Sequence, residues 1–319
     1  MNKKIGRILR YVVFLSLGLG LLWWTYRDTD LSDLTRGLAW EWIFVSLVLN
    51  YTATIIRGIR WNTLLKPLGY RADPWTCIHS VAFGYLMNDI VPRSGELARC
   101  GLLNRAEHIP VDKLFGTVII ERIVDILMLG LFVIAALLIH REALNVLFAQ
   151  TDGGKGNTIL LVLLAGVVFL GLLVMLLRAL RNYPWARKII SFLKGLLTGI
   201  KSVLLLKQKT RFILLTFGIW GTWLLMTQTM MYALEDTQMV QIGDCVFLVV
   251  AASLGMLIPA PGGVGAYHFT MSKGFEALGF AGPVGLAFAA ISWTGTKLLE
   301  VVVGVLGFFA VTLYKMRKK

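Results

Sequence analysis

Acidic and basic side chains occur together inside an apolar stretch, TVIIERIVDILML. Glu121 and Asp125 are four residues apart, so on a helix they share a face, and Arg122 lies within reach of Asp125. A charge at mid-membrane costs roughly 2.5–3.5 kcal/mol on insertion scales, so such groups pair or face water. Two chemistries fit: a proton relay or headgroup site, and a structural ion pair that fastens helices. We favour proton transfer at Asp125, because Arg122 needs only one carboxylate as an ion-pair partner and this helix face carries two.

A second group of polar residues surrounds a proline in NDIVPRSGELAR. Arg93 directly follows Pro92, and its planar guanidinium suits bidentate binding of a phosphate. Glu96 is placed to hold Arg93 or to take a proton, and Asn88 and Asp89 to cap a helix or line the same cavity. The alternative is that these cations are only topology-setting charges at the cytoplasmic surface.

The segment LIPAPGGVGAYH combines proline, glycine and histidine between two strongly apolar stretches. Such a break ends a helix inside the membrane, where free backbone N–H groups bind an anion such as a lipid phosphate. Pro261, Gly262, Gly263 and Gly265 form this turn, and glycine lets the backbone approach a ligand closely. His268 is a candidate titrating group or a hydrogen-bonded structural histidine. The alternative for the whole segment is a tight extracellular loop.

Two further charged groups lie within or beside apolar segments. Lys297 and Glu300 are three residues apart in TGTKLLEVVV, so we expect them to pair with each other or with charges of the fourth segment across the bundle. Arg57 and Arg60 in RGIRWNTLL are interpreted mainly as an interfacial anchor and cytoplasmic charge, with a grip on headgroups as the alternative.

The elements that must position these residues are membrane helices. The chain has 319 residues, 57% of them hydrophobic, and a mean hydropathy of +0.72, so it predicts an all-α, polytopic membrane protein with one transmembrane domain over 1–319. The net charge of +14 lies beside apolar segments, as cytoplasmic flanks do, which argues against nucleic acid as a partner. Six segments are long enough to span: 9–26, 42–60, 114–140, 158–180, 212–234 and 284–314.

Charge bias gives the orientation. The basic start MNKKIGRILR and the tail YKMRKK place both termini in the cytoplasm, and the acidic loops RDTDLSDLTRGLAWE and EDTQ lie outside. The first apolar run lacks a small-residue cleavage site, so we expect a retained helix of the cytoplasmic membrane. The three cysteines have neither disulfide nor metal spacing, and no motif for a cofactor is present.

Two regions do not fit complete spans. The odd–even count of crossings makes 74–112 enter and return on the cytoplasmic side, and 244–282 enter and return on the outer side. We therefore predict two opposed re-entrant hairpins of half-length helices, which fits an inverted repeat with a binding site where broken helices meet. Between the halves, 184–208 carries a basic residue every seventh position among apolar ones and predicts an amphipathic helix in the interface, or simply a basic linker.

RGIRW, NDIVPRSGELAR, ERIVD and PAPGGVGAYH, in this order, resemble the flippase-like membrane family related to the transmembrane region of lysylphosphatidylglycerol synthases. The resemblance covers nearly the whole chain. In the synthases this region is taken to move an aminoacylated lipid that a cytoplasmic aminoacyltransferase domain makes. No such domain follows within these 319 residues, so the resemblance implies translocation without synthesis. The matching polar positions are Arg60, Asn88, Pro92, Arg93, Glu96, Arg99, Glu121, Arg122, Asp125 and the 261–265 turn.

One position departs from the family pattern. Many members carry an acidic residue just after the glycine turn, where this chain has Tyr267 and His268. This difference disfavours a cationic aminoacyl headgroup and favours a phosphate-bearing lipid or lipid-linked sugar. The resemblance also implies enzymes of lipid or glycan synthesis as partners.

Three functions compete. The first is flipping of such a lipid, coupled to protons, without enzyme activity. The second is a membrane enzyme with Glu96, Glu121 or His268 as acid or base, and the third is a non-catalytic scaffold of a synthesis complex.

Overall fold

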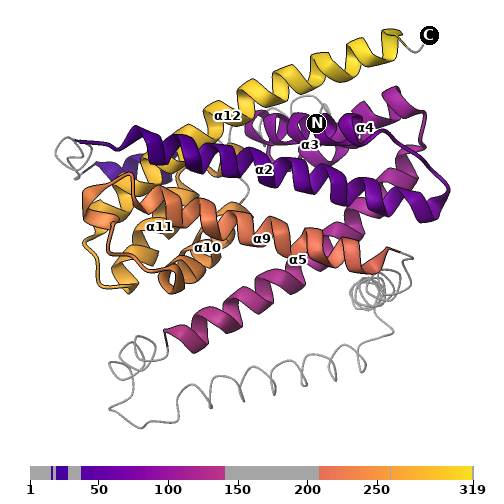
Figure 1. Ribbon diagram of the computed structural model, residues 1–319. Helices are drawn as coiled ribbons and strands as arrows, with labels where there is room; N and C mark the ends of the chain where they lie inside the picture. The colour runs from indigo at the N-terminus through magenta and orange to yellow at the C-terminus, as the bar shows by residue number, and fades with distance from the viewer. Residues whose placement is uncertain (1–15, 17–18, 28–36, 141–207, 259, 318–319) are drawn as a thin grey trace, which may run out of the picture.

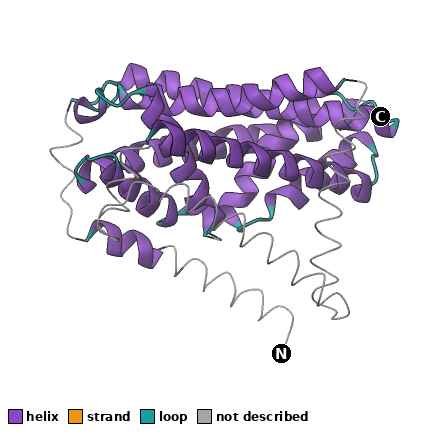
Figure 2. Ribbon diagram, turned by 90° about the horizontal axis from the view of Figure 1, so that it is seen from below, coloured by secondary structure: helices purple, strands orange, loops and turns teal. Residues whose placement is uncertain are grey.

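The structure, a computed structural model of the full chain, describes residues 16, 19–27, 37–140, 208–258 and 260–317. These residues form helices joined by short loops (Figure 2). Of the expected span 9–26 only residues 16 and 19–26 are described, as helix, and the expected elements 158–180 and 184–208 lie outside the described residues.

The first half of the described chain follows the order long, short, short, long. Its elements are α2 (Trp40–Leu65) with η1 (Lys66–Leu68), α3 (Pro74–Ile90), α4 (Gly95–Glu107) and α5 (Val111–Ile139). The α2–η1 segment and α5 each have 29 residues and are long and apolar enough to cross a membrane. The 17 residues of α3 and 13 of α4 span only ~25 and ~20 Å, less than the ~30 Å hydrocarbon core.

The second half repeats this order. Its elements are α9 (Lys209–Met231), η2 (Glu235–Thr237), α10 (Ile242–Leu257), η3 (Pro261–Gly263), α11 (Ala266–Ala277) and α12 (Gly282–Arg317). Here α9 and α12 are long and apolar enough to cross a membrane, and α10 and α11 have 16 and 12 residues. The predicted spans 42–60, 114–140, 212–234 and 284–314 are thus confirmed as long apolar helices.

The outer surface of the long helices is apolar. Large hydrophobic side chains that packing leaves exposed include Phe44, Leu127, Leu138, Leu214 and Leu306. An exposed apolar surface of this extent marks contact with a partner or with lipid. Together with the four candidate spans, it supports a polytopic helical membrane protein.

The two pairs of short helices lie at opposite ends of the bundle. In Figure 1, α3 and α4 lie toward the end where α2 finishes and α5 begins, whereas α10 and α11 lie where α9 finishes and α12 begins. The packing is reciprocal: α2 packs on α9, α12 packs on α3, and α5 packs on α10. The last long helix of each half therefore supports the first short helix of the other half.

Proline and local hydrogen bonds shape the turn between α3 and α4. Pro92 disfavours helical geometry in the residue before it, and Val91 is extended at φ −131° and ψ 116°. The Gly95 N–H donates to Asn88 Oδ1 at 2.7 Å, so Asn88 caps the start of α4, as one of the expectations for it required. Gly95 lies so close to the Gly84 carbonyl that no Cβ fits there.

Candidate functional site

A buried cluster of arginines and carboxylates joins α2, α4 and α5. Glu121 of α5 is fully buried and accepts from Arg60 of α2 at 3.4 Å and from Arg99 of α4 at 2.5 Å. Both carboxylate oxygens of Glu121 are therefore occupied by arginines from two other helices. The contacts fasten α2 and α4 to α5 inside the membrane.

Asp125, one turn further along α5, completes this cluster. Its carboxylate contacts Arg57 at 3.1 Å, Arg60 at 2.9 Å and Arg122 at 3.3 Å. The expected Arg122–Asp125 pair is confirmed, but the premise that one arginine serves both acids is wrong. Four arginines surround the two carboxylates, because α2 and α4 bring Arg57, Arg60 and Arg99 to the same place.

Hydroxyls and aromatic rings support the arginines. Arg57 donates to the Tyr85 hydroxyl at 2.9 Å, and Arg60 donates to Thr216 Oγ1 at 3.3 Å. The Arg99 guanidinium lies 4.5 Å from the centre of the Trp61 ring, within cation–π range. Arg57 and Arg60 are buried, so the interpretation of these residues as an interfacial anchor is corrected. They lie in the protein interior, where each is paired with at least one carboxylate.

The charges of the buried cluster do not cancel. Three buried arginines, Arg57, Arg60 and Arg99, face the carboxylates of buried Glu121 and partly buried Asp125, which leaves one formal positive charge in excess. Within the described residues, the buried donor atoms Arg99 Nη1, Arg60 Nε and Arg122 Nε have no hydrogen-bond partner, and neither does the buried acceptor atom Asp125 Oδ1. Buried donors without an acceptor are costly, so the hydrogen bonds of this cluster are incompletely satisfied.

The open side of the cluster is formed by Arg122 and Glu96. The Arg122 side chain is 43% exposed and lies 4.0 Å from Glu96 of α4. Of the two roles expected for Glu96, holding Arg93 is not observed, because its ion-pair partner in the described structure is Arg122. Its role in taking a proton stays a prediction. A cation at this depth that packing leaves uncovered faces water or a lipid headgroup.

A second charged group, Asp89–Lys297–Glu300, joins α3 to α12. Lys297 Nζ lies 2.8 Å from Asp89 Oδ1 and 2.5 Å from Glu300 Oε2. The expected Lys297–Glu300 pair is confirmed, and Asp89 is added from the other half of the chain. Two carboxylates share one ammonium, and Asp89 Oδ2 is buried without a hydrogen-bond partner in the described part of the chain. This trio therefore carries an excess negative charge.

The tips of the two short-helix pairs touch each other. Arg93, at φ +60° in the first tip, donates from Nη2 to the Leu257 carbonyl at the end of α10 at 2.8 Å. The carbonyl groups at a helix end lack partners within the helix, so Arg93 satisfies one of them. The two turns that the sequence singled out are thus neighbours in space.

The glycine turn 261–265 packs on the charged trio. Gly262 has φ +56°, and its carbonyl accepts from Trp293 Nε1 at 2.8 Å. A Cβ on Gly262 would lie 2.9 Å from Asp89 Oδ1, so only glycine allows this approach. The expectation of N–H groups open to an anion is met only partly, because Gly263, Val264 and Ala266 donate within the turn.

His268 is buried beneath this turn among aromatic rings. Its ring lies 5.2 Å from that of Trp293 and 5.6 Å from that of Tyr26. Among the described residues, His268 Nδ1 has no hydrogen-bond partner. The hydrogen bond expected of a structural histidine is therefore not made through Nδ1, and the alternative role of His268 as a titrating group stays a prediction.

The sequence did not indicate Tyr85 as a member of the first cluster, and it indicated other roles for Asp89 and Arg57 than the ion pairs that they form. Tyr85 carries no signal by itself, but Asp89 is an acid inside an apolar segment, and Arg57 lies one helical turn before Arg60. The last two were detectable as candidates for buried pairing. Among the residues that the structure describes, no group of three or more His, Cys, Asp or Glu side chains is placed to hold a metal ion.

Long apolar helices around buried ion pairs define a multi-pass helical membrane protein. The chain belongs to the family described as the lysylphosphatidylglycerol synthase TM region, whose profile matches residues 7–307. It is 25% identical over 305 residues to a UPF0104 membrane protein of Pyrococcus horikoshii, which covers 86% of this chain and 88% of the relative. It is 32% identical over 88 residues to a UPF0104 membrane protein of Methanocaldococcus jannaschii, covering 27% of this chain and 26% of the relative. No solved structure matches the chain.

Proposed function

We propose that the protein flips a phosphate-bearing lipid or lipid-linked headgroup across the cytoplasmic membrane. The observation that carries the proposal is the contact of two opposed tips between the long helices, with Arg93 of one bonded to Leu257 of the other. Broken helices that meet between repeated halves form the substrate site in many transporters. The family membership is consistent with this function.

The helix lengths and packing support re-entrant hairpins and an inverted repeat. The order long, short, short, long occurs twice, and each half packs its last helix on the first short helix of the other. Exchange of this kind is what a two-fold relation between halves produces, since a contact from element i to element j is matched by one from j to i. In this proposal both termini lie in the cytoplasm.

The arginine cluster supports a phosphate as the transported group. The cluster has an excess positive charge and three unpartnered arginine nitrogens, and one of these arginines, Arg122, lies beside Glu96 on the open side of the cluster. Arginine binds phosphate through parallel N–H donors. We place the headgroup between this cluster and Arg93, with the enzymes that make or use the lipid as partners.

The charged trio is the better candidate for proton coupling. A proton on Glu121 or Asp125 would leave buried arginines unpaired, which is strongly unfavourable. A proton on Asp89 or Glu300 would leave Lys297 paired with the other carboxylate. We therefore assign the fastening role to Glu121 and Asp125 and the coupling role to Asp89 and Glu300.

Reconstitution tests the proposal. The purified chain is placed in liposomes that carry fluorescent phospholipids in one leaflet, and movement to the other leaflet is measured beside chemical analysis of the lipid. Movement of the lipid without chemical change supports flipping, whereas chemically altered lipid would indicate an enzyme. The absence of both movement and chemical change would favour a scaffold. Arg93→Ala should slow movement at least about tenfold, as loss of one charged contact does, and Arg105→Ala on the exposed end of α4 serves as the control.

A further inference from the structure

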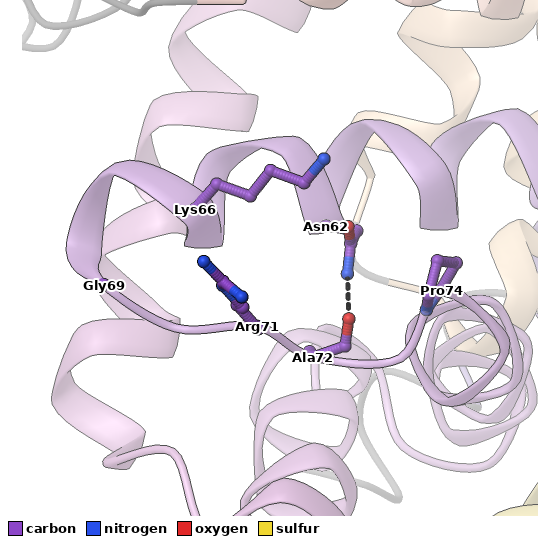
Figure 3. Close-up of a pocket in the computed structure, with 6 residues that line it drawn as sticks. All are labelled: Asn62, Lys66, Gly69, Arg71, Ala72 and Pro74. Atoms are coloured by element: carbon purple, nitrogen blue, oxygen red, sulfur yellow. Dashed lines mark hydrogen bonds between the residues drawn. The ribbon is translucent and has the colours of Figure 1, made fainter.

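A cavity of about 660 Å³ lies where α2 ends and α3 begins, away from the two charged clusters (Figure 3). It is lined by Asn62, Lys66, Gly69, Arg71, Ala72 and Pro74. Figure 3 shows the Lys66 and Arg71 side chains on two sides of this space, with Asn62 between the helix and the loop.

The loop over this cavity is held in place by hydrogen bonds. Asn62 is buried, and its Nδ2 donates to the Ala72 carbonyl at 2.7 Å. Gly69 has φ +85°, and its N–H donates to the Lys66 carbonyl at 3.0 Å. The chain therefore turns sharply after α2 and returns over Asn62, which keeps the cavity open between the helix end and the loop.

The two cations at the cavity are not neutralised by nearby acids. Among the described residues, no carboxylate lies within ion-pair distance of Lys66 or Arg71. Two acids of this region have other hydrogen-bond partners, and one of them, Asp73, accepts through Oδ1 from the Trp75 N–H at 2.9 Å. Glu107 accepts from the Asp73 N–H at 3.2 Å and from the Thr76 hydroxyl at 2.8 Å. Lys66 and Arg71 are left to face an outside anion.

The cavity lies at the end of a candidate membrane span. The candidate span Trp40–Leu68 ends at its rim, and Lys66 belongs to the last turn of that span. Leu68 is 46% exposed and Trp75 is 53% exposed on either side of the loop. Tryptophan is enriched where the hydrocarbon core meets the headgroups, and basic residues there attract anionic lipids.

We propose that this cavity binds the phosphate of an anionic lipid headgroup through Lys66 and Arg71. The site is peripheral to the tips and does not depend on the proposed translocation, since it follows from the loop, its charges and its depth alone. A free phosphate ion would offer the same chemistry, so the test separates the two sources.

The test measures lipid binding to the purified full-length chain in neutral detergent. The probes are dioleoylphosphatidylglycerol, dioleoylphosphatidylcholine and inorganic phosphate, and the melting temperature is followed as each is added. The test variant is Lys66→Ala with Arg71→Ala. The control variant, Arg105→Ala with Lys113→Ala, removes the same charge from exposed positions at the end of α4 and the start of α5.

We expect phosphatidylglycerol to bind the native chain and the control with similar apparent affinity, and phosphatidylcholine to bind more weakly. The test variant should bind phosphatidylglycerol roughly 10- to 30-fold more weakly, as the loss of two interfacial cations predicts. The charge-preserving variant Lys66→Arg with Arg71→Lys should retain binding. Equal weakening in both double alanine variants, or in neither, would overturn the site. Binding of inorganic phosphate with the same dependence on Lys66 and Arg71 would overturn the lipid assignment.

Discussion

The guanidinium of Arg93 donates a hydrogen bond to the Leu257 carbonyl, 164 residues further along the chain, at 2.8 Å. One residue belongs to the turn between α3 and α4, and the other ends α10. Both are exposed within the described structure, so this bond can open without uncovering a packed core. Its opening would free the Arg93 cation, while the glycine turn stays packed beside Asp89.

The helix lengths predict which side of the membrane each loop reaches. Single cysteines at Lys66 and Arg105 should react with a membrane-impermeant maleimide from the cytoplasmic side, because in the proposed re-entrant hairpin α3 and α4 return to the side from which they start. A cysteine at Glu235 should react from outside. Labelling is measured in sealed right-side-out and inverted vesicles. Reaction at Arg105 from the same side as Glu235 would exclude the first re-entrant hairpin.

Glu121→Gln should destabilise the protein strongly. The amide would leave Arg60 and Arg99 without their shared carboxylate, and removing one partner of a buried ion pair costs about 3–5 kcal/mol. Glu276→Gln breaks an exposed pair with Lys273 and should cost about 0–1 kcal/mol. Melting curves in detergent compare the two variants. Similar small losses in both would show that the cluster does not fasten α2 and α4 to α5.

Gly262→Ala should impair folding and transport more than Gly279→Ala. Both glycines have positive φ, so each substitution adds backbone strain of roughly 1–2 kcal/mol. Only at Gly262 does the new Cβ also approach Asp89 Oδ1, at 2.9 Å, whereas no other group lies within 4 Å of a Cβ at Gly279. Melting temperature and lipid movement are measured for both. Equal effects would mean that the close approach to the trio is unimportant.

Glu300→Gln should flatten the dependence of lipid movement on pH. The charged groups that face Glu300 in the described structure are Lys297 on its own helix and Asp89 on α3. From α2, Asn50 contributes only an amide, which donates to Thr296. An amide at position 300 cannot exchange a proton, yet Lys297 keeps Asp89 as its partner. The measurement is a pH series of lipid movement in liposomes.

Asp125→Asn is the matched control for this series. It should lower the melting temperature, because three arginines lose a partner, and leave the pH dependence of the folded fraction intact. This expectation differs from the interpretation of the sequence, which favours Asp125 as the residue that transfers the proton. Loss of the pH dependence in Asp125→Asn, with a normal profile in Glu300→Gln, would contradict the assignment.

Local features of the sequence predicted the long helices and the turns well. The length of an apolar segment predicts a membrane span. Pro92 predicts a break between α3 and α4, because proline disfavours helical geometry in the residue before it whatever its tertiary contacts. The pairs Arg122–Asp125 and Lys297–Glu300 were also predictable, because residues three apart on a helix are neighbours. These properties depend on spacing alone.

Contacts between distant segments could not be predicted in the same way. Arg60 meets Glu121 across 61 positions, and Lys297 meets Asp89 across 208 positions, only because the helices pack in one particular arrangement. From the sequence alone, Arg60 resembles a cytoplasmic charge at the end of a membrane helix, because nothing in the sequence indicates that Glu121 lies next to it. The number of partners available to Asp125 was underestimated for the same reason.

Linking the two tips tests the central claim most directly. Cysteines replace Arg93 and Leu257, whereas Cys77, Cys100 and Cys245 are buried and protected from a polar reagent. Because the loss of Arg93 alone should already slow movement, the reference rate is that of the unlinked double-cysteine variant. A short bis-maleimide that joins the tips should abolish the remaining lipid movement in liposomes, and a monofunctional maleimide on the same variant controls for modification alone. Lipid movement at the unlinked rate after complete cross-linking would contradict a path that opens between the tips.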